Sequence, residues 1–362
     1  MVADPATWSG RRVFLTGHTG FKGGWLALWL QQMGANVHGY ALEPPTQPSI
    51  FDVAGVAEGM RSVVGDIRDL DNLCSHVAEF EPEVVLHLAA QSLVRPSYID
   101  PVGTYATNVI GTVHVLEAIR RAPSVKAAVV VTSDKCYENN EWVWGYRETD
   151  PMGGHDPYSN SKGCAELVTA TYRRSYFSDS GAAGPALASA RAGNVIGGGD
   201  WATDRLVPDF IRAISRRDSI RIRNPNAQRP WQHVLEPLGG YLLLAEKLLG
   251  PEGRKFASGW NFGPNDDDAI PVGALVKELA ALWGPEASFT IDDGVHPHEA
   301  ALLKLDCSKA RAHLGWQPRL DVGTALSWTV EWHKAMIAGA NMREITATQI
   351  ARFQGGASGP RL

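Results

Sequence analysis

Residues 13–24 read Val-Phe-Leu-Thr-Gly-His-Thr-Gly-Phe-Lys-Gly-Gly, and the expected architecture follows from this stretch. A short apolar run ends in three glycines, Gly17, Gly20 and Gly23, and apolar residues then recur with helical spacing over 25–33. We expect a strand, a tight turn and a helix, in which the glycines let the backbone approach a pyrophosphate at the positive helix N-terminus. The spacing is Gly-x-x-Gly-x-x-Gly, so an ordinary glycine-rich turn is the alternative for this stretch taken alone.

The rest of the first half alternates short apolar runs with helical patterns. The expected strands are 12–16, 36–40, 61–65, 84–88, 127–132 and 187–190, and the expected helices are 25–33, 70–79, 104–120 and 158–176. Several of the strands are continuously apolar, as a sheet covered on both faces requires. We therefore expect an α/β fold built on a Rossmann-type, doubly wound parallel sheet, with ligands at the carboxyl ends of its strands.

Two domains are expected from the chain length and because the regular alternation of strand and helix patterns ends after about residue 195. Residues 1–190 are expected to form a dinucleotide-binding domain, and segments near 225–265 to return to its sheet. Residues 191–350, with many prolines, are expected to form mainly a smaller α/β substrate-binding domain. The glycine-rich stretch 354–362 is expected to be a flexible tail.

Composition excludes several classes of function. The 362 residues are 44% hydrophobic and 20% charged, which is ordinary for a globular protein. A formal charge of −5 argues against nucleic acid as a partner, and no apolar run is long enough for a membrane span. The four cysteines lie far apart without a Cys-x-x-Cys pair, so we expect neither a disulfide framework nor a metal site. The N-terminus lacks the pattern of a signal peptide, and a cytoplasmic location is expected.

Redox chemistry is indicated by Ser133 and by the pair Tyr158 and Lys162. A tyrosine four residues before a lysine lies one turn away from it on the same helix face. The lysine cation then favours the phenolate, which can exchange a proton with an alcohol, while a serine hydroxyl at a strand end holds that alcohol for hydride removal. Tyr-x-x-x-Lys is a weak motif alone, and the glycine turn that can bind a hydride acceptor strengthens it.

With these motifs the sequence resembles the extended short-chain dehydrogenase/reductase family, and within it the enzymes that modify nucleotide sugars. The matching motifs are Thr16-Gly17-x-x-Gly20-Phe21-x-Gly23, Gly65-Asp66-Ile67, His87-Leu88-Ala89-Ala90-Gln91, Asn108-x-x-Gly111-Thr112, Tyr158-x-x-x-Lys162, Arg191-x-x-Asn194, His298-Glu299 and Leu314-Gly315-Trp316-x-Pro318. The resemblance implies that the cofactor is bound by Gly17, His18, Thr19, Gly20, Phe21, Lys22, Gly23, Asp66, Ile67, Leu88, Ala89, Ala90, Gln91, Asn108, Tyr158 and Lys162. It places Asp66 and Ile67 at the adenine and implies that Asn108 orders the active site.

Within that family, the residues after the hydroxyl select the reaction. The 4,6-dehydratases have Asp-Glu there, and this chain has Asp134-Lys135, which is most similar to the branch acting on CDP-glucose. The resemblance implies conversion of CDP-glucose to CDP-4-keto-6-deoxyglucose and water, for deoxysugars of surface polysaccharide such as O-antigen. C4 is oxidised, which makes the C5 proton acidic; water then leaves across C5 and C6, and the hydride returns to C6.

The predicted catalytic roles follow these steps. Tyr158 is the C4 base, Ser133 is its hydrogen-bond partner, and Lys162 tunes Tyr158. Asp134 is the acid at C6, for which burial must keep its proton in place. Lys135 is the predicted C5 base, which requires a neutral amine. Alternatively, Lys135 stays charged and stabilises the enolate, or it points to solvent.

Contacts to the substrate are predicted from fewer signals. Arg229, one of seven arginines between positions 205 and 229, matches the family's phosphate-binding position, and a guanidinium suits a diphosphate. Arg191 and Asn194 are candidates for sugar or diphosphate contact, and His298 and Glu299 for closing the nucleotide pocket. A purely structural role is the alternative for each of these residues.

NAD is the expected cofactor, with NADP as the alternative. The second strand ends without the acid that usually holds the ribose diol of NAD, but Glu43 lies twenty residues past Gly23. No arginine follows at once to bind a 2′-phosphate. His18, inside the glycine turn, could contact the phosphates or be a surface turn residue. The resemblance further implies a homodimer formed through the helices near 104–120 and 158–176.

Two other functions compete with the dehydratase. An epimerase or dehydrogenase acting on a related nucleotide sugar is the nearer one, although neither reaction eliminates water and so neither needs the acid Asp134. A non-catalytic NAD-binding regulator is the other, although such proteins commonly lose the Tyr-x-x-x-Lys pair that this chain keeps. The residues themselves do not specify cytosine over another nucleobase.

Overall fold

The centre of the protein is a seven-stranded sheet. It is seen in a computed structural model that describes residues 2–178, 184–222, 224–292 and 302–355. The strand order is β10-β6-β5-β4-β1-β2-β3, and every neighbouring pair is parallel. The strands are β1 (Arg12–Thr16), β2 (Asn36–Ala41), β3 (Arg61–Val64), β4 (Val84–His87), β5 (Ala127–Val131), β6 (Ala186–Ala192) and β10 (Gly259–Phe262). The predicted doubly wound parallel sheet is confirmed.

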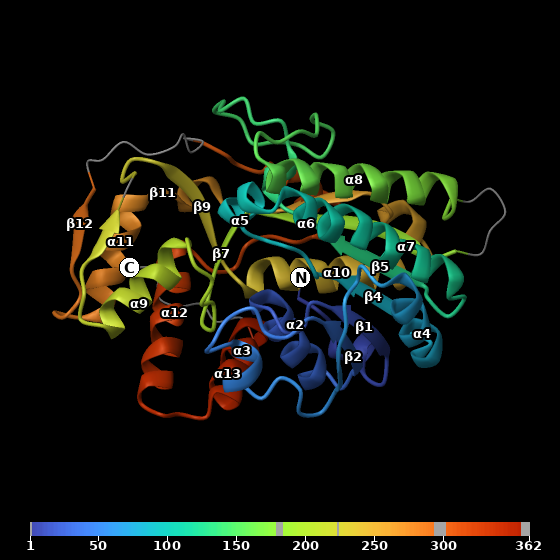
Figure 1. Ribbon diagram of the computed structural model, residues 1–362, viewed down its shortest axis with the longest axis horizontal. Coiled ribbons are helices and arrows are strands. Elements are labelled where there is room, and N and C mark those ends of the chain that lie inside the picture. The colour runs from blue at the N-terminus through green and yellow to red at the C-terminus, as the bar shows by residue number, and fades with distance from the viewer. Residues whose placement is uncertain (1, 179–183, 223, 293–301, 356–362) are drawn as a thin grey trace.

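Helices cover both faces of this sheet (Figure 1). One face packs on α2 (Phe21–Gln32), α10 (Leu235–Leu249) and α13 (Met342–Gly355), and the other on α4 (Leu70–Phe80), α7 (Gly111–Arg121) and α8 (Pro157–Ser175). The sequence of β1 is apolar because the strand is buried on both faces: Val13 and Leu15 pack in the core under α2, and Phe14 packs in the core under α7.

A smaller α/β region lies beside the sheet, at the left of Figure 1. Its strands are β7 (Asn194–Ile196), β8 (Ile220–Ile222), β9 (Gln228–His233), β11 (Ala269–Pro271) and β12 (Phe289–Ile291), and its helices are α9 (Leu206–Ser215), α11 (Val272–Trp283) and α12 (Val322–Ile337). These elements share a third hydrophobic core that includes Phe210, Leu275 and Leu326. Because β7 begins two residues after β6 ends, the main sheet leads directly into this region.

Several short elements complete the chain. The short helices are α1 (Pro5–Trp8), α3 (Ile50–Val53) and α5 (Val94–Ile99), and the 3-10 or π turns outside the main helices are η2 (Asp134–Cys136), η3 (Gly253–Phe256), η4 (Asp266–Asp268) and η5 (Ala310–Leu314). Among the helices of the described segments, none combines the length and the apolar character that crossing a membrane requires.

Two segments from late in the chain pack on the first sheet. Helix α10 contacts β5 and β6, and β10 pairs with β6 at the sheet edge, with Asn261 opposite Arg191. Helix α13 packs against α2, where Phe353 meets the Trp29 ring at a centroid distance of 5.7 Å. The main sheet is therefore covered by residues far beyond position 190.

Most expected helices are present, with ends that differ from the prediction by a few residues. The first begins at Phe21 rather than at 25, because Gly20 is its N-cap. The helix expected over 104–120 consists of α6 (Pro101–Tyr105), the π turn η1 (Ala106–Ile110) and α7. Gln354 and Gly355, expected in a flexible tail, belong to α13, which continues because Phe353 is anchored on α2. The rest of that predicted tail, 356–362, lies outside the described residues.

Candidate active site

The turn after β1 has a backbone cradle that fits a pyrophosphate. A Cβ at Gly17 would lie 2.7 Å from the Ala89 nitrogen, and one at Gly23 would lie 2.0 Å from the Gly17 oxygen. Gly17 also has a φ of +79°, which side chains rarely adopt. A Cβ at Gly20 would meet only the Gly17 oxygen, at 3.5 Å. Packing therefore requires glycine at 17 and 23, whereas Gly20 leaves open space at the N-terminus of α2.

His18 lies in this turn, but its ring is buried. Its Nε2 is 2.7 Å from Ser62 Oγ of β3, and its edge meets the Phe51 ring. Burial lowers the pKa of His18 to about 4, so the ring is neutral at neutral pH. The predicted alternative of a surface turn residue is wrong. The neighbouring Thr19 donates its hydroxyl to the Leu42 carbonyl at 2.8 Å, which ties the turn to the end of β2.

The segment 88–91, predicted to line the dinucleotide, is held in place by hydrogen bonds to Thr16. Thr16 Oγ1 accepts hydrogen bonds from the backbone nitrogens of Leu88 and Ala89, both at 3.1 Å. The same hydroxyl contacts His87 Nδ1 at 2.7 Å in the buried interior. The turn after β4 is thus held against the turn after β1, and both lie at the carboxyl ends of their strands.

Asn108 joins that segment to α8. Its Oδ1 accepts from the Gln91 nitrogen at 2.9 Å, and its Nδ2 donates to the Gln91 carbonyl and to Ser161 Oγ, both at 2.9 Å. Asn108 lies in the π turn η1, a feature that often marks functional sites. These contacts support the predicted ordering role of Asn108.

The residues predicted at the adenine end lie after β3. Arg68 donates to both oxygens of Asp66, and this pairing holds the pKa of Asp66 below its usual value. Ile67 is buried beside them. Glu43, the candidate for the ribose diol, is exposed and lines a cavity of about 430 Å³ after β2. Glu43 follows β2 and Asp66 follows β3, and these strands are parallel neighbours, so both residues lie at the same edge of the sheet.

The turn after β5 brings three of the five predicted catalytic residues into contact. Ser133 donates its hydroxyl to Asp134 Oδ1 at 2.9 Å, and Lys135 Nζ lies 3.4 Å from the same oxygen. Asp134 is 1% exposed, and no described atom forms a hydrogen bond with its Oδ2. Gly193 leaves room for this oxygen, since a Cβ there would lie 3.0 Å from it, a role that the sequence did not indicate. A buried carboxyl with one oxygen unpartnered suits a group that gives a proton to a ligand.

Helix α8 places Tyr158 opposite this turn. The helix begins with Pro157 after Asp156, whose carboxylate accepts from the Ser159 nitrogen at 2.8 Å. This cap fixes where the helix begins. The Tyr158 nitrogen donates to Ser97 Oγ at 3.1 Å, and the Ser133 hydroxyl lies near enough to the phenol to lower its pKa. Tyr158 and Ser133 are therefore together, as predicted.

Lys162 lies one turn further along α8, on the same helix as Tyr158, and its effect on that phenol stays a prediction. Burial raises the pKa of Tyr158, against the opposing effects of the Lys135 charge and the Ser133 hydrogen bond. Burial also lowers the pKa of Lys162 to about 8. Among the neighbouring charges, those of Lys135 and Arg205 lower the pKa of Tyr158, although burial outweighs them.

Lys22 reaches the same cavity from the glycine turn. Its Nζ lies 3.5 Å from Tyr241 Oη of α10. Burial lowers the pKa of Lys22 to about 7, and repulsion by Lys162 adds to this effect whereas Asp134 opposes it. The sequence placed Lys22 only among the cofactor residues. Tyr241 gave no signal, because it lies in an apolar helical run and reaches the site only through folding.

Arg205 also lies near the catalytic residues and was missed as an individual candidate. Its Nη1 lies 3.0 Å from Asp200 Oδ2, and its Nη2 donates to Ser92 Oγ at 3.3 Å. The charge of Arg205 acts on the Tyr158 phenol. In the sequence Arg205 was one of seven similar arginines, and only the fold distinguishes it from the others.

Arg191 has a different role from the predicted one. Its Nε and Nη2 donate to the two oxygens of Glu166 at 2.9 and 2.8 Å, and its Nη1 donates to Tyr137 Oη at 2.5 Å. The side chain is 4% exposed. The predicted sugar or diphosphate contact is corrected, because a buried carboxylate and a phenol already occupy this guanidinium.

The other predicted substrate residues lie in the smaller region or outside the described chain. Asn194 opens β7 and is paired with Trp231 of β9. Arg229 is half-buried on β9, where its Nη1 donates to the Gln228 carbonyl at 3.0 Å. His298 and Glu299 lie outside the described residues.

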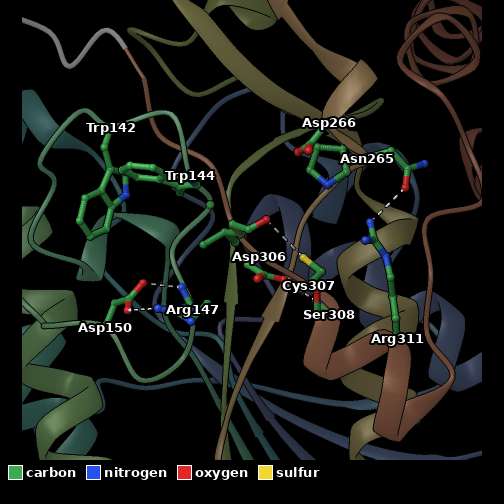
Figure 2. Close-up of a pocket in the computed structure, with 13 residues that line it drawn as sticks. Trp142, Trp144, Arg147, Asp150, Asn265, Asp266, Asp306, Cys307, Ser308 and Arg311 are labelled. Carbon is green, nitrogen blue, oxygen red and sulfur yellow. Dashed lines mark hydrogen bonds and ion pairs between the residues drawn. The ribbon is translucent and has the colours of Figure 1, made fainter.

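A separate cavity of about 760 Å³ lies between the segment 142–150 and residues 305–311 (Figure 2). Trp142 and Trp144 lie on one side of it and Arg311 on the other. Trp142 stacks on Tyr146 with ring centroids 5.2 Å apart. Among its described lining residues are none of those predicted to bind cofactor or to act in catalysis, so this cavity is distinct from the site above.

Comparison with known proteins assigns the chain to a family. The family model described as GDP-mannose 4,6 dehydratase matches residues 14–327. The chain belongs to this family. It is 55% identical to the CDP-glucose 4,6-dehydratase of Salmonella typhimurium over 352 residues, which cover 97% of this chain and 98% of that protein.

Solved structures show the same fold at lower identity. A dTDP-glucose 4,6-dehydratase from Bacillus anthracis, in complex with NAD, matches with a TM-score of 0.74 at 20% identity and covers 91% of this chain and 99% of that one. A UDP-glucose-4-epimerase from Stenotrophomonas maltophila, with bound NAD, matches with a TM-score of 0.78 at 22% identity and covers 91% and 100%. Proteins named for both reaction types therefore share this fold.

The glycine turn gives a matched pair of variants. In Gly20→Ala the new Cβ enters the open space, so we expect dinucleotide binding to weaken about tenfold or more while the free energy of unfolding stays within about 1 kcal/mol. In Gly23→Ala the Cβ meets the Gly17 oxygen, so we expect a loss of about 2–4 kcal/mol. Denaturant unfolding without nucleotide and fluorescence titration with NADH measure the two effects. Equal destabilisation by both variants would contradict the assignment.

Arg191 and Arg205 give a second pair. Arg191→Met leaves the buried Glu166 carboxylate without its main partner, so we expect the free energy of unfolding to fall by about 3–5 kcal/mol. Arg205→Met leaves the buried Asp200 carboxylate without its partly exposed partner, so we expect a smaller loss of about 1–3 kcal/mol, together with a KM for substrate raised about tenfold or more. Denaturant unfolding and steady-state kinetics separate these outcomes. A stable Arg191→Met protein with a raised KM would restore the predicted ligand role.

Proposed function

We propose that this protein is a nucleotide-sugar 4,6-dehydratase, a hydro-lyase that converts CDP-glucose to CDP-4-keto-6-deoxyglucose and water. The observation that carries the proposal is the contact of Ser133, Asp134 and Lys135 after β5, next to Tyr158. An epimerase or a dehydrogenase has no hydroxyl to expel, whereas a dehydratase needs an acid at C6. A non-catalytic regulator would have no use for the buried amine of Lys162, whose charge is costly to bury.

NAD is the proposed cofactor. The turn around Gly20, the segment 88–91 and Asp66 would hold the dinucleotide, and Glu43 would reach its ribose diol. When bound, NAD would take the C4 hydrogen of the sugar as hydride and later release it to C6. Solved structures of the same fold that contain NAD support this choice over NADP.

The residues of the chain would move the protons. Tyr158 accepts the proton of the C4 hydroxyl, which Ser133 helps to hold. Once C4 is a ketone, Lys135 removes the acidified C5 proton. Asp134 gives its proton to the C6 oxygen, which leaves as water. Lys135 then returns its proton to C5, so that the product differs from the substrate by one water.

Substrate identity rests on the Salmonella relative. A relative that is 55% identical over nearly the whole chain and is named for CDP-glucose supports CDP-glucose here. Arg205 near the catalytic residues and Arg229 on β9 are the proposed partners of the diphosphate. Asn194, His298 and Glu299 remain proposed substrate contacts. The four cysteines are unpaired, which suits the reducing cytoplasm that we propose as the location.

A homodimer is proposed through one exposed apolar surface. Its large side chains, with their exposed fractions, are Ile99 on α5 at 85%, Val102 on α6 at 78%, Ile110 on η1 at 49% and Leu167 on α8 at 58%. Helices α6 and α8 pack side by side, so these residues lie on neighbouring elements. Exposed apolar side chains gathered on neighbouring elements favour a protein interface.

The reaction is tested by mass spectrometry. Purified protein is incubated with CDP-, UDP-, dTDP- and GDP-glucose, first without and then with added NAD. Of the four substrates, we expect only CDP-glucose to lose one water. A new isomer of unchanged mass would indicate an epimerase, and loss of two hydrogens would indicate a dehydrogenase.

Lys135 is tested by hydrogen exchange at C5. In deuterated water, the Lys135→Met variant should stop deuterium from entering C5 while C4 oxidation, followed as reduced nicotinamide absorbance, continues. Lys135→Arg serves as a control that keeps the charge but is a poor base. Unchanged exchange in Lys135→Met would eliminate the base role.

The dimer is tested by analytical ultracentrifugation. We expect the wild type at twice the chain mass of 39.2 kDa and a Val102→Glu, Leu167→Glu variant at the monomer mass, because both charges would be buried in the interface. Ile337→Glu changes a residue that is 62% exposed on α12 and should stay dimeric. A monomeric wild type would refute the dimer.

A further inference from the structure

The proposed reaction leaves one proton in the wrong place at the end of each turnover. Tyr158 gains a proton from the C4 hydroxyl, and Asp134 loses one to the departing water. Lys135 takes the C5 proton and gives it back, and the hydride returns to the sugar, so neither changes this balance. The next turnover needs a deprotonated Tyr158 and a protonated Asp134. One proton must therefore pass from the phenol to the carboxyl.

The structure contains a direct route between these two groups. Ser133 Oγ donates to Asp134 Oδ1 at 2.9 Å, and its hydroxyl lies near enough to the Tyr158 phenol to lower the pKa of that phenol. The exposed fractions are 8% for Tyr158, 6% for Ser133 and 1% for Asp134, so all three are buried. A hydroxyl can accept one proton while it donates another. Ser133 thus connects the group with the surplus proton to the group that lacks one.

We propose that Ser133 passes the proton from Tyr158 back to Asp134 after each turnover. The Tyr158 O–H bond breaks as an O–H bond forms at Ser133 Oγ, and the former Ser133 O–H bond breaks as one forms at Asp134. The step uses no solvent proton and no electron leaves or enters. It rests on the proposed dehydratase function, because an epimerase or dehydrogenase does not consume the Asp134 proton.

Both ends of this step keep their hydrogen bonds. Before it, Tyr158 donates to Ser133, which donates to Asp134. After it, Asp134 donates to Ser133, which donates to the phenolate. No buried donor or acceptor loses its partner, so the transfer avoids that cost. The negative charge moves to the phenol, where the charge of Arg205 favours it.

The competing route runs through solvent. Tyr158 would release its proton to water, and Asp134 would take another from water. Small proton carriers such as imidazole accelerate a solvent route, whereas they leave an internal transfer unchanged. Dependence of the turnover rate on buffer concentration therefore distinguishes the two routes. A role of Ser133 in holding the sugar alone would not create such a dependence.

The experiment compares wild type, Ser133→Thr and Ser133→Ala. Turnover of CDP-glucose is measured with saturating NAD at rising imidazole and constant ionic strength. We expect wild type and Ser133→Thr, which keeps the hydroxyl, to have kcat values independent of imidazole. We expect Ser133→Ala to lose about 100-fold in kcat and to recover severalfold as imidazole rises. The double variant with Asp134→Asn, which has no proton to regain, should show no recovery.

Three results would overturn the proposal. They are a wild-type kcat that rises with imidazole, a Ser133→Ala kcat that does not, and a Ser133→Thr protein that behaves like Ser133→Ala. Thermal unfolding of each variant checks that it is folded. If the wild type forms no dehydrated product, the proposed function itself fails; if it forms product and any of the three results appears, only the proton return fails.

Discussion

The geometry of the catalytic cavity depends on one buried carboxylate, that of Glu166. It lies on α8 one turn after Lys162 and accepts from Thr132 Oγ1 at 2.5 Å and from Ser189 Oγ at 2.6 Å, in addition to the two bonds from Arg191. Thr132 immediately precedes Ser133, so the same group anchors the strand end that carries Ser133 and the helix that carries Tyr158. Such a buried network adds little net stability, but it fixes the position of the strand end that carries Ser133 relative to the helix that carries Tyr158.

Around this anchor the cavity collects more basic than acidic groups. Asp134 lies among Lys135, Lys162 and Lys22, and burial lowers the pKa of Lys162 to about 8 and that of Lys22 to about 7. These shifts put proton exchange within reach of neutral pH, where each amine would otherwise remain charged. The same excess of cations suits a substrate with a diphosphate and an enolate intermediate. Gathering these cations in one site lowers the stability of the folded protein, as in many active sites.

Much of the fold and part of the site could be predicted, because they depend on neighbours in sequence. The glycine spacing of 17, 20 and 23 indicates a tight turn by local sterics, and the spacing of Tyr158 and Lys162 indicates one helix face. What could not be predicted depends on partners brought together by folding. The sequence left Arg191 available for a ligand, but in the fold its guanidinium donates to Glu166 and Tyr137.

The other residues that the sequence left undecided also depend on partners that are distant in the chain. His18 was ambiguous because Ser62 and Phe51, which bury it, lie more than thirty residues away. Arg205 was one of several arginines until the Ser92 contact set it apart. The upward shift of the Tyr158 pKa comes from burial, which helical spacing does not encode.

The central claim is that hydrogen removed from C4 returns within the same molecule to C6. It is tested most directly with CDP-glucose that carries deuterium at C4, incubated with unlabelled NAD, and with the product examined by NMR. The account predicts one deuterium on the C6 methyl group of the 4-keto product, with none in the solvent or in free NADH. Product without deuterium at C6, or deuterium recovered in free NADH, would contradict it.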